Sequence, residues 1–243
     1  MRFDIITLFP ELFAPLMQTG IIRRAFEARV DSAPAVEVKF TNPRDFADGN
    51  YRRVDDRPFG GGPGMLMMAE PLARCVEGIQ AERAEKKIPL CPVVLFSPVG
   101  QPLVHAVVAR FAEASVANPG AILICGRYEG IDQRFIDQFV TEQISLGDFV
   151  LSGGEIAAMA LLDAVARLQS GVLSDEQSHV QDSFNPSIGG LLDHPHYTRP
   201  EVWRGQSVPA VLVGGNHAEI DKWRAAQRQT ITQATRPGLI KPS

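Results

Sequence analysis

The sequence predicts an α/β protein with a mostly parallel sheet, followed by a small, mainly helical C-terminal domain. Strand-like runs alternate with helical patterns, and the runs 92–97 and 121–125 are almost wholly apolar. This alternation is typical of a parallel sheet with helices on both faces, whose central strands are apolar throughout. After Leu168 the texture changes to a polar stretch, which marks the end of the first domain.

Apolar runs and helical periodicity give the order of the expected elements. Strands are expected at residues 2–9, 35–40, 92–97, 121–125 and 139–146. Helices are expected at residues 20–30, 70–86, 102–114, 131–138 and 153–168. Most of these helices connect one strand to the next, as the crossovers of a parallel sheet require.

The remainder of the chain divides into a loop and a smaller module. Residues 169–190 show neither a helical nor a strand period, which at this length is typical of a linker or a functional loop. A helix is expected near 216–233, with Ile220, Trp223 and Ile231 on one face. We therefore expect three segments, residues 1–168, 169–190 and 191–243.

Composition indicates an ordinary globular protein of the cytoplasm. Of the 243 residues, 45% are hydrophobic and 21% charged, and no apolar run approaches the roughly 20 residues of a membrane span. The acidic residue at position 4 argues against a secretory signal. Cys75, Cys91 and Cys125 lie in or beside apolar runs without CxxC spacing, so we expect buried, reduced thiols.

Charge is distributed unevenly along the chain. The formal net charge is -4, but residues 199–243 carry +4 and residues 1–198 carry −8. A basic C-terminal region on an acidic body is typical of a polyanion-binding appendage. A solvated helix face explains the same charges equally well, so charge alone leaves both interpretations open.

Three loops follow expected strands and contain glycine. They are Ser97–Gly100 after 92–97, Gly126–Gly130 after 121–125, and Leu146–Asp148 after 139–146. Ligands of open α/β sheets bind beyond the carboxyl ends of the strands, so these loops predict one pocket. No GxGxxG fingerprint occurs, which argues against an ordinary dinucleotide site.

Other motifs are ambiguous, or they argue against particular functions. The Gly153-Gly154 turn fits a plain helix start and a ligand site about equally well. Ser152 and Glu155 have the spacing of a capping box at the start of helix 153–168. The glycine run within 55–64 lacks the Gly-Lys-Ser/Thr ending of a triphosphate loop, and no GxSxG elbow of a serine hydrolase occurs. His194 and His196 have no third ligand at a recognisable spacing, so no metal site is predicted.

Six motifs together resemble one known family. They are GGGPGMLM (60–67), ICGRYEGID (124–132), LGDFVLSGGE (146–155), DSF (182–184), LLDHPHYTRPEVW (191–203) and GNHAEIDKWR (215–224). The chain resembles the bacterial tRNA (guanine-37-N1)-methyltransferase family, of the SPOUT class. The resemblance extends over nearly the whole chain, and several of its motifs are long.

The resemblance implies a fold, a reaction and a methyl donor. The fold would contain a deep trefoil knot, and the family is a homodimer with a shared active site. The reaction would methylate tRNA with guanine at position 37, using S-adenosylmethionine as donor and showing magnesium dependence, with Glu129 as a possible partner of the ion. The implied cofactor-binding residues are Ser97, Pro98, Gly126, Tyr128, Glu129, Leu146, Gly147, Asp148, Phe149, Val150, Leu151, Gly153 and Gly154.

The resemblance also implies the catalytic and RNA-binding residues. Asp182 matches the family's general base and Arg167 the arginine that assists it, while Gln181 stands where an acidic residue is expected. The C-terminal module and the loop would bind the anticodon stem-loop, with the target base flipped out. The implied tRNA contacts are Asp193, His196, Arg199, Lys222 and Arg224.

Two other functions are compatible with parts of the sequence. A non-catalytic RNA-binding protein would use the basic C-terminal region and would not transfer a methyl group. A SPOUT methyltransferase of ribosomal RNA or of a ribose hydroxyl would keep the pocket but change the acceptor. A carboxylate on the 169–190 loop favours proton removal from a base, and therefore the tRNA reaction.

Overall fold

A computed structural model describes residues 1–28, 33–113, 119–175 and 179–240. The chain forms two compact units, Met1–Ser174 and Asp175–Ser243, which we call the N-terminal and C-terminal units. Each unit is described by itself. None of the helices in the described ranges is long and apolar enough to cross a lipid bilayer.

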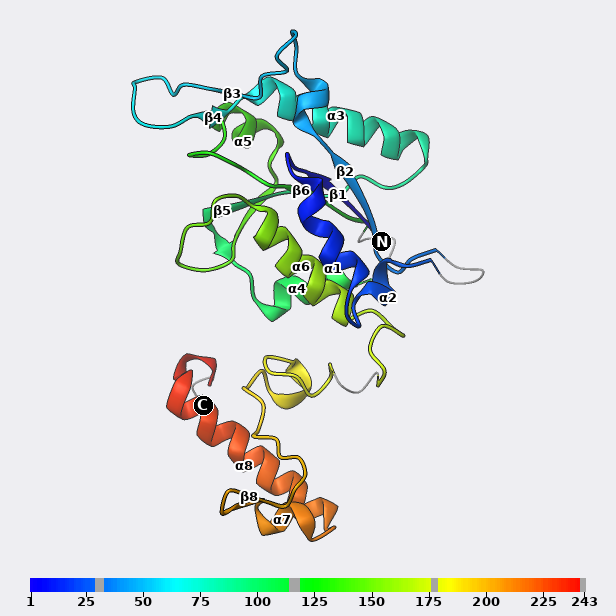
Figure 1. The fold of residues 1–243 in the computed structure, drawn as a ribbon, viewed down its shortest axis with the longest axis vertical. Helices are drawn as coiled ribbons and strands as arrows, with labels where there is room; N and C mark the ends of the chain where they lie inside the picture. The colour runs from blue at the N-terminus through cyan, green and yellow to red at the C-terminus, as the bar shows by residue number, and fades with distance from the viewer. Residues whose placement is uncertain (29–32, 114–118, 176–178, 241–243) are drawn as a thin grey trace. The chain divides into compact units, whose positions relative to one another are not determined.

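The N-terminal unit contains a five-stranded sheet in the order β2-β1-β6-β5-β7 (Figure 1). The strands are β1 (Arg2–Ile6), β2 (Glu37–Thr41), β5 (Val93–Pro102), β6 (Gly120–Ile124) and β7 (Glu142–Ser145). All neighbouring pairs are parallel, as predicted. The two apolar runs form β5 and β6, which lie inside the sheet and are covered on both faces, as their composition indicates.

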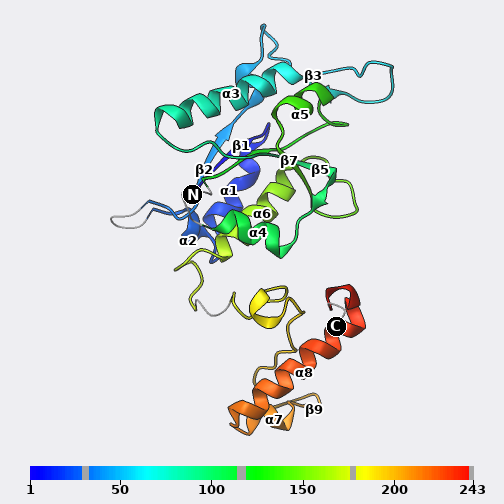
Figure 2. The ribbon, with the colours of Figure 1, turned by 180° about the vertical axis from the view of Figure 1, so that it is seen from behind.

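Helices cover both faces of the sheet (Figure 2). One face is covered by α3 (Ala69–Glu85) and α5 (Gln133–Phe139). The other is covered by α1 (Ala14–Gln18), α2 (Arg23–Phe26), α4 (His105–Ala112) and α6 (Glu155–Arg167). Two apolar cores result, and alternation along β1 sends Phe3 and Ile5 into one and Ile6 into the other.

A buried group of charges fixes β1 against α3. Asp4 and Arg83 are both fully buried, and Arg83 Nη1 lies 2.5 Å from Asp4 Oδ2. Arg2 binds the other carboxylate oxygen and also reaches Glu82, which in turn pairs with Lys39. Buried charges are tolerated only when paired, so these residues form one interdependent set.

Element boundaries differ from the sequence predictions in places. Strand 2–9 ends at Ile6 and is followed by a 3-10 helix, Pro10–Phe13. Of helix 20–30, residues 29 and 30 lie outside the described ranges, and only Arg23–Phe26 is helical among the others. Strand 92–97 continues to Pro102, with a register shift against β7 between Phe96 and Gln101.

Short elements complete the N-terminal unit. A 3-10 helix, Pro43–Phe46, follows β2, with the Asn42 side chain capping it. β3 (Asp55–Asp56) pairs antiparallel with β4 (Leu66–Met67), so the glycine run 60–64 is the connection of a hairpin. Val172 is fully buried in the apolar core of this unit, although the sequence predicts a loop from 169 onward.

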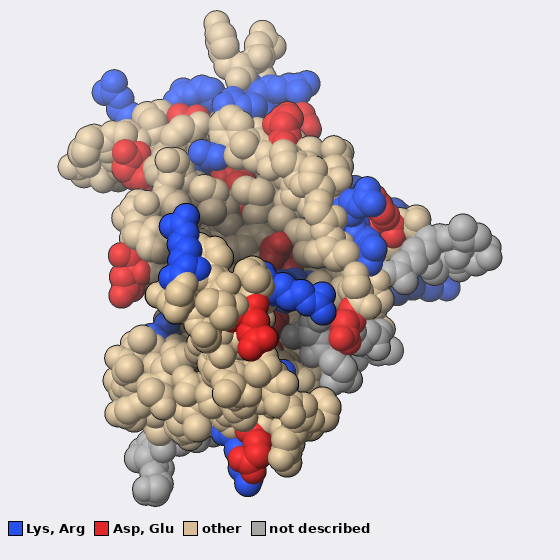
Figure 3. Space-filling model, turned by 60° about the horizontal axis from the view of Figure 1, so that its bottom comes forward, with Lys and Arg blue, Asp and Glu red and all other residues tan. Residues whose placement is uncertain are grey.

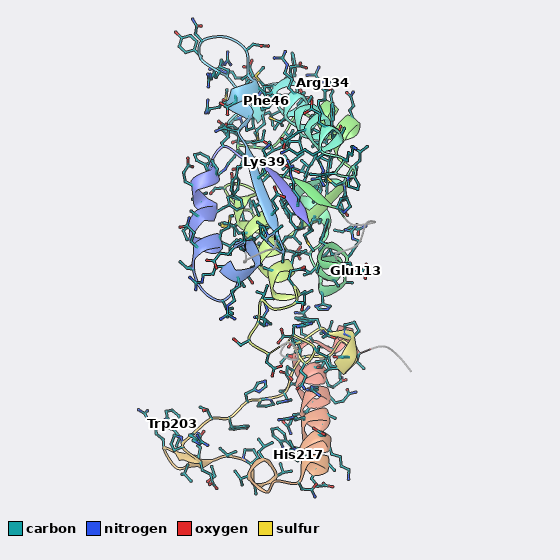
Figure 4. The ribbon with its side chains drawn as sticks, turned by 90° about the vertical axis from the view of Figure 1, so that its right-hand side faces the viewer. Lys39, Phe46, Glu113, Arg134, Trp203 and His217 are labelled. Atoms are coloured by element: carbon teal, nitrogen blue, oxygen red, sulfur yellow. The ribbon has the colours of Figure 1, made fainter. Side chains whose placement is uncertain are left out.

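The C-terminal unit is built around one long helix, α8 (His217–Thr235), which the sequence predicts at 216–233. It also contains a short hairpin, β8 (Val202–Trp203) and β9 (Gln206–Ser207), and a short helix, α7 (Ala210–Val213). Two 3-10 helices, Pro186–Ile188 and Pro237–Leu239, lie near its ends. Figure 4 shows His217 at the beginning of α8 and Trp203 on the hairpin.

Candidate functional site

A cavity of about 380 Å³ opens at the carboxyl ends of β5, β6 and β7. Residues of all three glycine-containing segments line it together, although Ser97–Gly100 lies within β5 and not in a loop after it. Asp148 is the exception among the predicted cofactor-binding residues, because it is not part of the lining. The lining includes Ser97, Pro98, Gly126, Tyr128, Glu129, Leu146, Gly147, Phe149, Val150, Leu151, Gly153 and Gly154.

Two of the loops are joined by backbone contacts that only glycine allows. The N–H of Gly154 donates to the carbonyl of Gly126 at 3.0 Å. A Cβ added at Gly154 would lie 2.8 Å from the Cα of Cys125, closer than two carbon atoms can approach. The close approach of the loops therefore depends on the missing side chain, as is usual where two backbones meet.

Arg127 and Glu155 form an ion pair behind this contact. Glu155 is 1% exposed; its Oε1 accepts from Thr7 Oγ1 at 2.8 Å and from Arg127 Nε at 3.1 Å. Arg127 also donates to the Ser152 carbonyl at 3.3 Å. The predicted capping box is therefore wrong: Gly154 is the N-cap of α6, because the Glu155 carboxylate binds Thr7 and Arg127 instead.

Tyr128 and Glu129 connect the cavity to the glycine run. The Tyr128 hydroxyl donates to Asp55 Oδ1 at 3.2 Å, and burial together with this carboxylate raises the pKa of Tyr128. The N–H of Met65 donates to Glu129 Oε2 at 2.9 Å. A Cβ at Gly64 would overlap the Glu129 carboxylate, so this glycine is also required for the contact.

The cavity combines apolar walls with accessible main chain. Leu95, Phe96, Ile131 and Ile144 line it beside the backbone of the loops. At its edge the backbone is tightly packed, because a Cβ at Gly100 would lie 2.5 Å from the Ile144 nitrogen. Such a site suits a ligand with a flat apolar part and polar ends, and its volume falls in the usual range for small ligands.

The predicted catalytic pair is divided between the two units. Arg167 is the last residue of α6 in the N-terminal unit. Asp182 belongs to the C-terminal unit, in a turn where its carbonyl accepts from the Asn185 N–H at 3.2 Å. Each residue is therefore placed within its own unit, and their catalytic roles stay predictions.

The predicted RNA contacts all lie in the C-terminal unit. Lys222 and Arg224 are on α8, where Lys222 pairs with Glu219 at 2.8 Å and Arg224 with Asp221 at 3.7 Å. Arg199 is exposed, and Asp193 lies 2.9 Å from His196. In Figure 3, Lys and Arg are interspersed with Asp and Glu among the described residues in view.

Comparison with known proteins decides which family this arrangement represents. The sequence model of the family described as tRNA (Guanine-1)-methyltransferase TrmD matches residues 1–242. The chain belongs to this family.

Relatives from several bacteria carry the same description. A protein named tRNA (guanine-N(1)-)-methyltransferase from Albidiferax ferrireducens is 66% identical over 99% of this chain and 92% of its own length. Proteins of the same name are 64% identical in a Polaromonas species and 61% in Paracidovorax citrulli. Each alignment covers 99% of this chain, and 90% and 91% of these two relatives.

Within this TrmD family chain, the structure adds three candidate residues to those found from sequence. Arg127 contributes to the cavity lining and has its guanidinium 4.4 Å from the Phe9 ring centre. Trp203 is 58% exposed on the β8–β9 hairpin, with the Arg204 guanidinium 4.9 Å from its ring centre. Trp203 and Arg204 could have been found from the sequence Trp-Arg-Gly, which places an aromatic and a cationic side chain at a glycine turn.

Proposed function

We propose that the protein transfers a methyl group from S-adenosylmethionine to N1 of guanine 37 in tRNA. The observation that carries the proposal is the cavity at the carboxyl ends of β5, β6 and β7, in a chain that matches the methyltransferase family over residues 1–242. Family membership supports the reaction class. The donor, the position in the tRNA and the residue roles are our inference.

The cavity residues fit the methyl donor. Its apolar walls suit an adenine ring, and the N–H and carbonyl groups of the glycine loops suit the polar ends. S-adenosylmethionine, when bound, supplies an electrophilic methyl group on a sulfonium. The Gly126–Gly130 and Leu146–Gly154 segments would orient the ligand. Leu95 and Ile131 would exclude water from it.

Asp182 is the proposed general base. Guanine N1 carries a proton and is a poor nucleophile, so a carboxylate within hydrogen-bond reach must accept that proton during attack. Arg167 is proposed to stabilise negative charge that develops on guanine O6. We propose that RNA orders the Asp182 turn beside the methyl donor, which would make catalysis depend on the correct substrate.

The proposed RNA-binding surface includes the C-terminal unit. Arg199, Lys222 and Arg224 supply cations for phosphates, and the exposed Trp203 and Arg204 present flat surfaces on which an unpaired base can stack. Asp193 and His196 are proposed as further RNA contacts because they belong to the 191–203 motif that resembles the family. The remaining parts of the proposal are a trefoil knot, a homodimer with a shared active site, a magnesium requirement and a cytoplasmic location.

Methyl transfer to defined transcripts tests the proposal. The protein is incubated with labelled S-adenosylmethionine and tRNA carrying guanine or adenine at position 37, and we expect transfer only to the guanine transcript. Asp182→Asn should lose at least about 10²-fold in single-turnover rate, the scale of a missing general base, while still binding S-adenosylmethionine. Asp137→Asn, an exposed residue of α5, is the matched control.

The alternatives predict different results. A non-catalytic RNA-binding protein would bind tRNA without methylating it. A methyltransferase with another acceptor would be inactive on both transcripts but active on ribosomal RNA. Near-normal transfer by Asp182→Asn would show that Asp182 is not the base, even if the overall reaction is correct.

A further inference from the structure

Three side chains of types that bind metals lie close together in the C-terminal unit, and none of them lines the cavity of the N-terminal unit. One ligand atom each from Asp193, His194 and His196 lies within 4.8 Å of the others. His196 Nε2 is 2.9 Å from Asp193 Oδ2, and His194 Nε2 is 3.7 Å from Asp193 Oδ1. Asp193 is not predicted as a third ligand from the sequence, because it is adjacent to the first histidine and fits no common zinc spacing.

The His194 ring is oriented before any ligand arrives. Its Nδ1 lies 3.0 Å from the Pro195 carbonyl oxygen, which can only accept, so Nδ1 carries a proton. In the neutral ring the lone pair is then on Nε2, and this atom faces the Asp193 carboxylate. The nitrogen lone pair and the carboxylate oxygen repel each other, and a cation bound between them would remove this repulsion. Carbonyl-oriented imidazoles of this kind are typical of metal-binding histidines.

The surroundings of His194 restrict its movement. The residue is only 7% exposed, and the Trp223 ring lies 6.2 Å away in an edge-on arrangement. The centre of the His196 ring lies 4.4 Å from the centre of the His194 ring. His196 is 71% exposed and gives a path from solvent.

Hydrogen bonds to one oxygen fix the orientation of the Asp193 carboxylate. The His194 N–H donates to Oδ1 at 2.7 Å, and Arg228 Nε donates to the same oxygen at 3.4 Å. Oδ2, on the His196 side, is the oxygen better placed to coordinate a cation.

We propose that Asp193, His194 and His196 bind one Zn²⁺ ion, or a chemically similar d-block divalent cation. Two imidazole nitrogens and one carboxylate oxygen form a donor set that suits zinc, with a fourth position for water. Magnesium is a poor match, because it prefers oxygen ligands in an octahedral arrangement. The zinc site is separate from the magnesium requirement proposed above. Asp193 and His196 are also proposed RNA contacts, but zinc binding is measured without RNA, so the two proposals can fail independently.

The bound ion would order residues 193–196, a segment in contact with two other parts of the C-terminal unit. Asp193 contacts α8 through Arg228, and the Leu192 N–H donates to Thr232 Oγ1 of the same helix at 3.0 Å. The Asp193 N–H also donates to Ser183 Oγ at 2.9 Å, one residue after Asp182. A metal ion bound by Asp193, His194 and His196 would therefore stabilise a segment that contacts both α8 and the Asp182 turn.

Titration of the full chain with zinc alone tests this proposal. After removal of metals with a chelator, calorimetry and competition with a chromophoric chelator should show one zinc site per chain, with no RNA present. His194→Ala and His196→Ala should each weaken binding by at least about 100-fold, beyond the effect of losing an outer contact. His217→Ala, at the beginning of α8 and outside the cluster, is the matched control and should bind like the wild type.

Two further measurements make the outcome decisive. Co²⁺ in place of zinc should give the strong visible absorption of a site with few ligands, and this signal should be lost in His196→Ala. Zinc should raise the melting temperature of the wild type and of His217→Ala, but not of His196→Ala. Because His196 is exposed, its replacement should leave folding intact if His194→Ala does not fold. No zinc binding, or binding equally tight in wild type and His196→Ala, would overturn the proposal, whatever the methyl-transfer assay shows.

Discussion

The cavity of the N-terminal unit and the Asp182 turn of the C-terminal unit are built in different ways. The cavity loops extend from the sheet and are fixed by buried groups, among them Glu155 with its partners Thr7 and Arg127. The Asp182 turn is stabilised by local contacts, such as Asn185 Nδ2 donating to the His179 carbonyl at 2.9 Å. A cavity held by buried groups suits a small ligand, whereas a locally stabilised turn can be adjusted by a large binding partner.

The largest effect is expected from the buried charges that support the sheet. Asp4→Ala leaves the guanidinium of Arg83 buried beside an apolar methyl group, which should lower the free energy of unfolding of the N-terminal unit by about 3–5 kcal/mol. Urea denaturation measures this loss. Asp48→Ala removes an exposed ion pair with Arg74 and should leave the midpoint nearly unchanged. Equal midpoints for the two variants would contradict the proposed role of the buried pair.

A smaller effect, confined to the cavity, is expected from Gly154→Ala. The new Cβ would meet the backbone at Cys125, and the two loops would have to separate, at a cost of about 1–3 kcal/mol. We expect S-adenosylmethionine affinity, measured by calorimetry, to fall at least about 10-fold, since about 1.4 kcal/mol corresponds to a factor of ten. Gly238→Ala, whose Cβ would contact nothing within 4 Å, is the control. Unchanged affinity in Gly154→Ala would show that the loop contact does not shape the ligand site.

The sequence predicts the parts of the molecule that follow from local patterns. Apolar runs identify the sheet strands, and turns at their carboxyl ends predict the cavity, because parallel strands bring those ends to one edge. Pairings between distant residues leave no such pattern. Asp4 and Arg83 are 79 positions apart, and nothing in either neighbourhood indicates that they meet in the core.

The capping-box error and two features that the sequence does not predict have the same origin. Ser152 and Glu155 match a capping box, but tertiary contacts with Thr7, 148 positions away, take the Glu155 carboxylate. Val172 lies in a segment without periodicity and is nevertheless buried in the N-terminal core. The Asp193 cluster combines neighbouring residues in the sequence, yet it depends on a particular loop conformation that no periodic pattern reports.

The smallest effect should come from the turn itself, through Asn185→Ala. The Asn185 side chain accepts from the Ser187 N–H at 2.9 Å and donates to the His179 carbonyl, so it closes the turn that contains Asp182. Loss of such a cap costs roughly 1 kcal/mol, which corresponds to about a fivefold lower rate of methyl transfer if the turn must be ordered in the transition state. Single-turnover kinetics with saturating tRNA measure this rate, and S-adenosylmethionine affinity should not change.

Asn216→Ala separates turn order from general loss of stability. Asn216 caps α8 by accepting from the Glu219 N–H, so its replacement should cost a similar free energy elsewhere in the C-terminal unit. If both variants lose the same fraction of the methyl-transfer rate, the Asp182 turn has no special role. If Asn185→Ala also loses S-adenosylmethionine affinity, the turn and the cavity are not independent. Only a selective rate loss in Asn185→Ala supports a cofactor site formed by the core and a base ordered by local contacts.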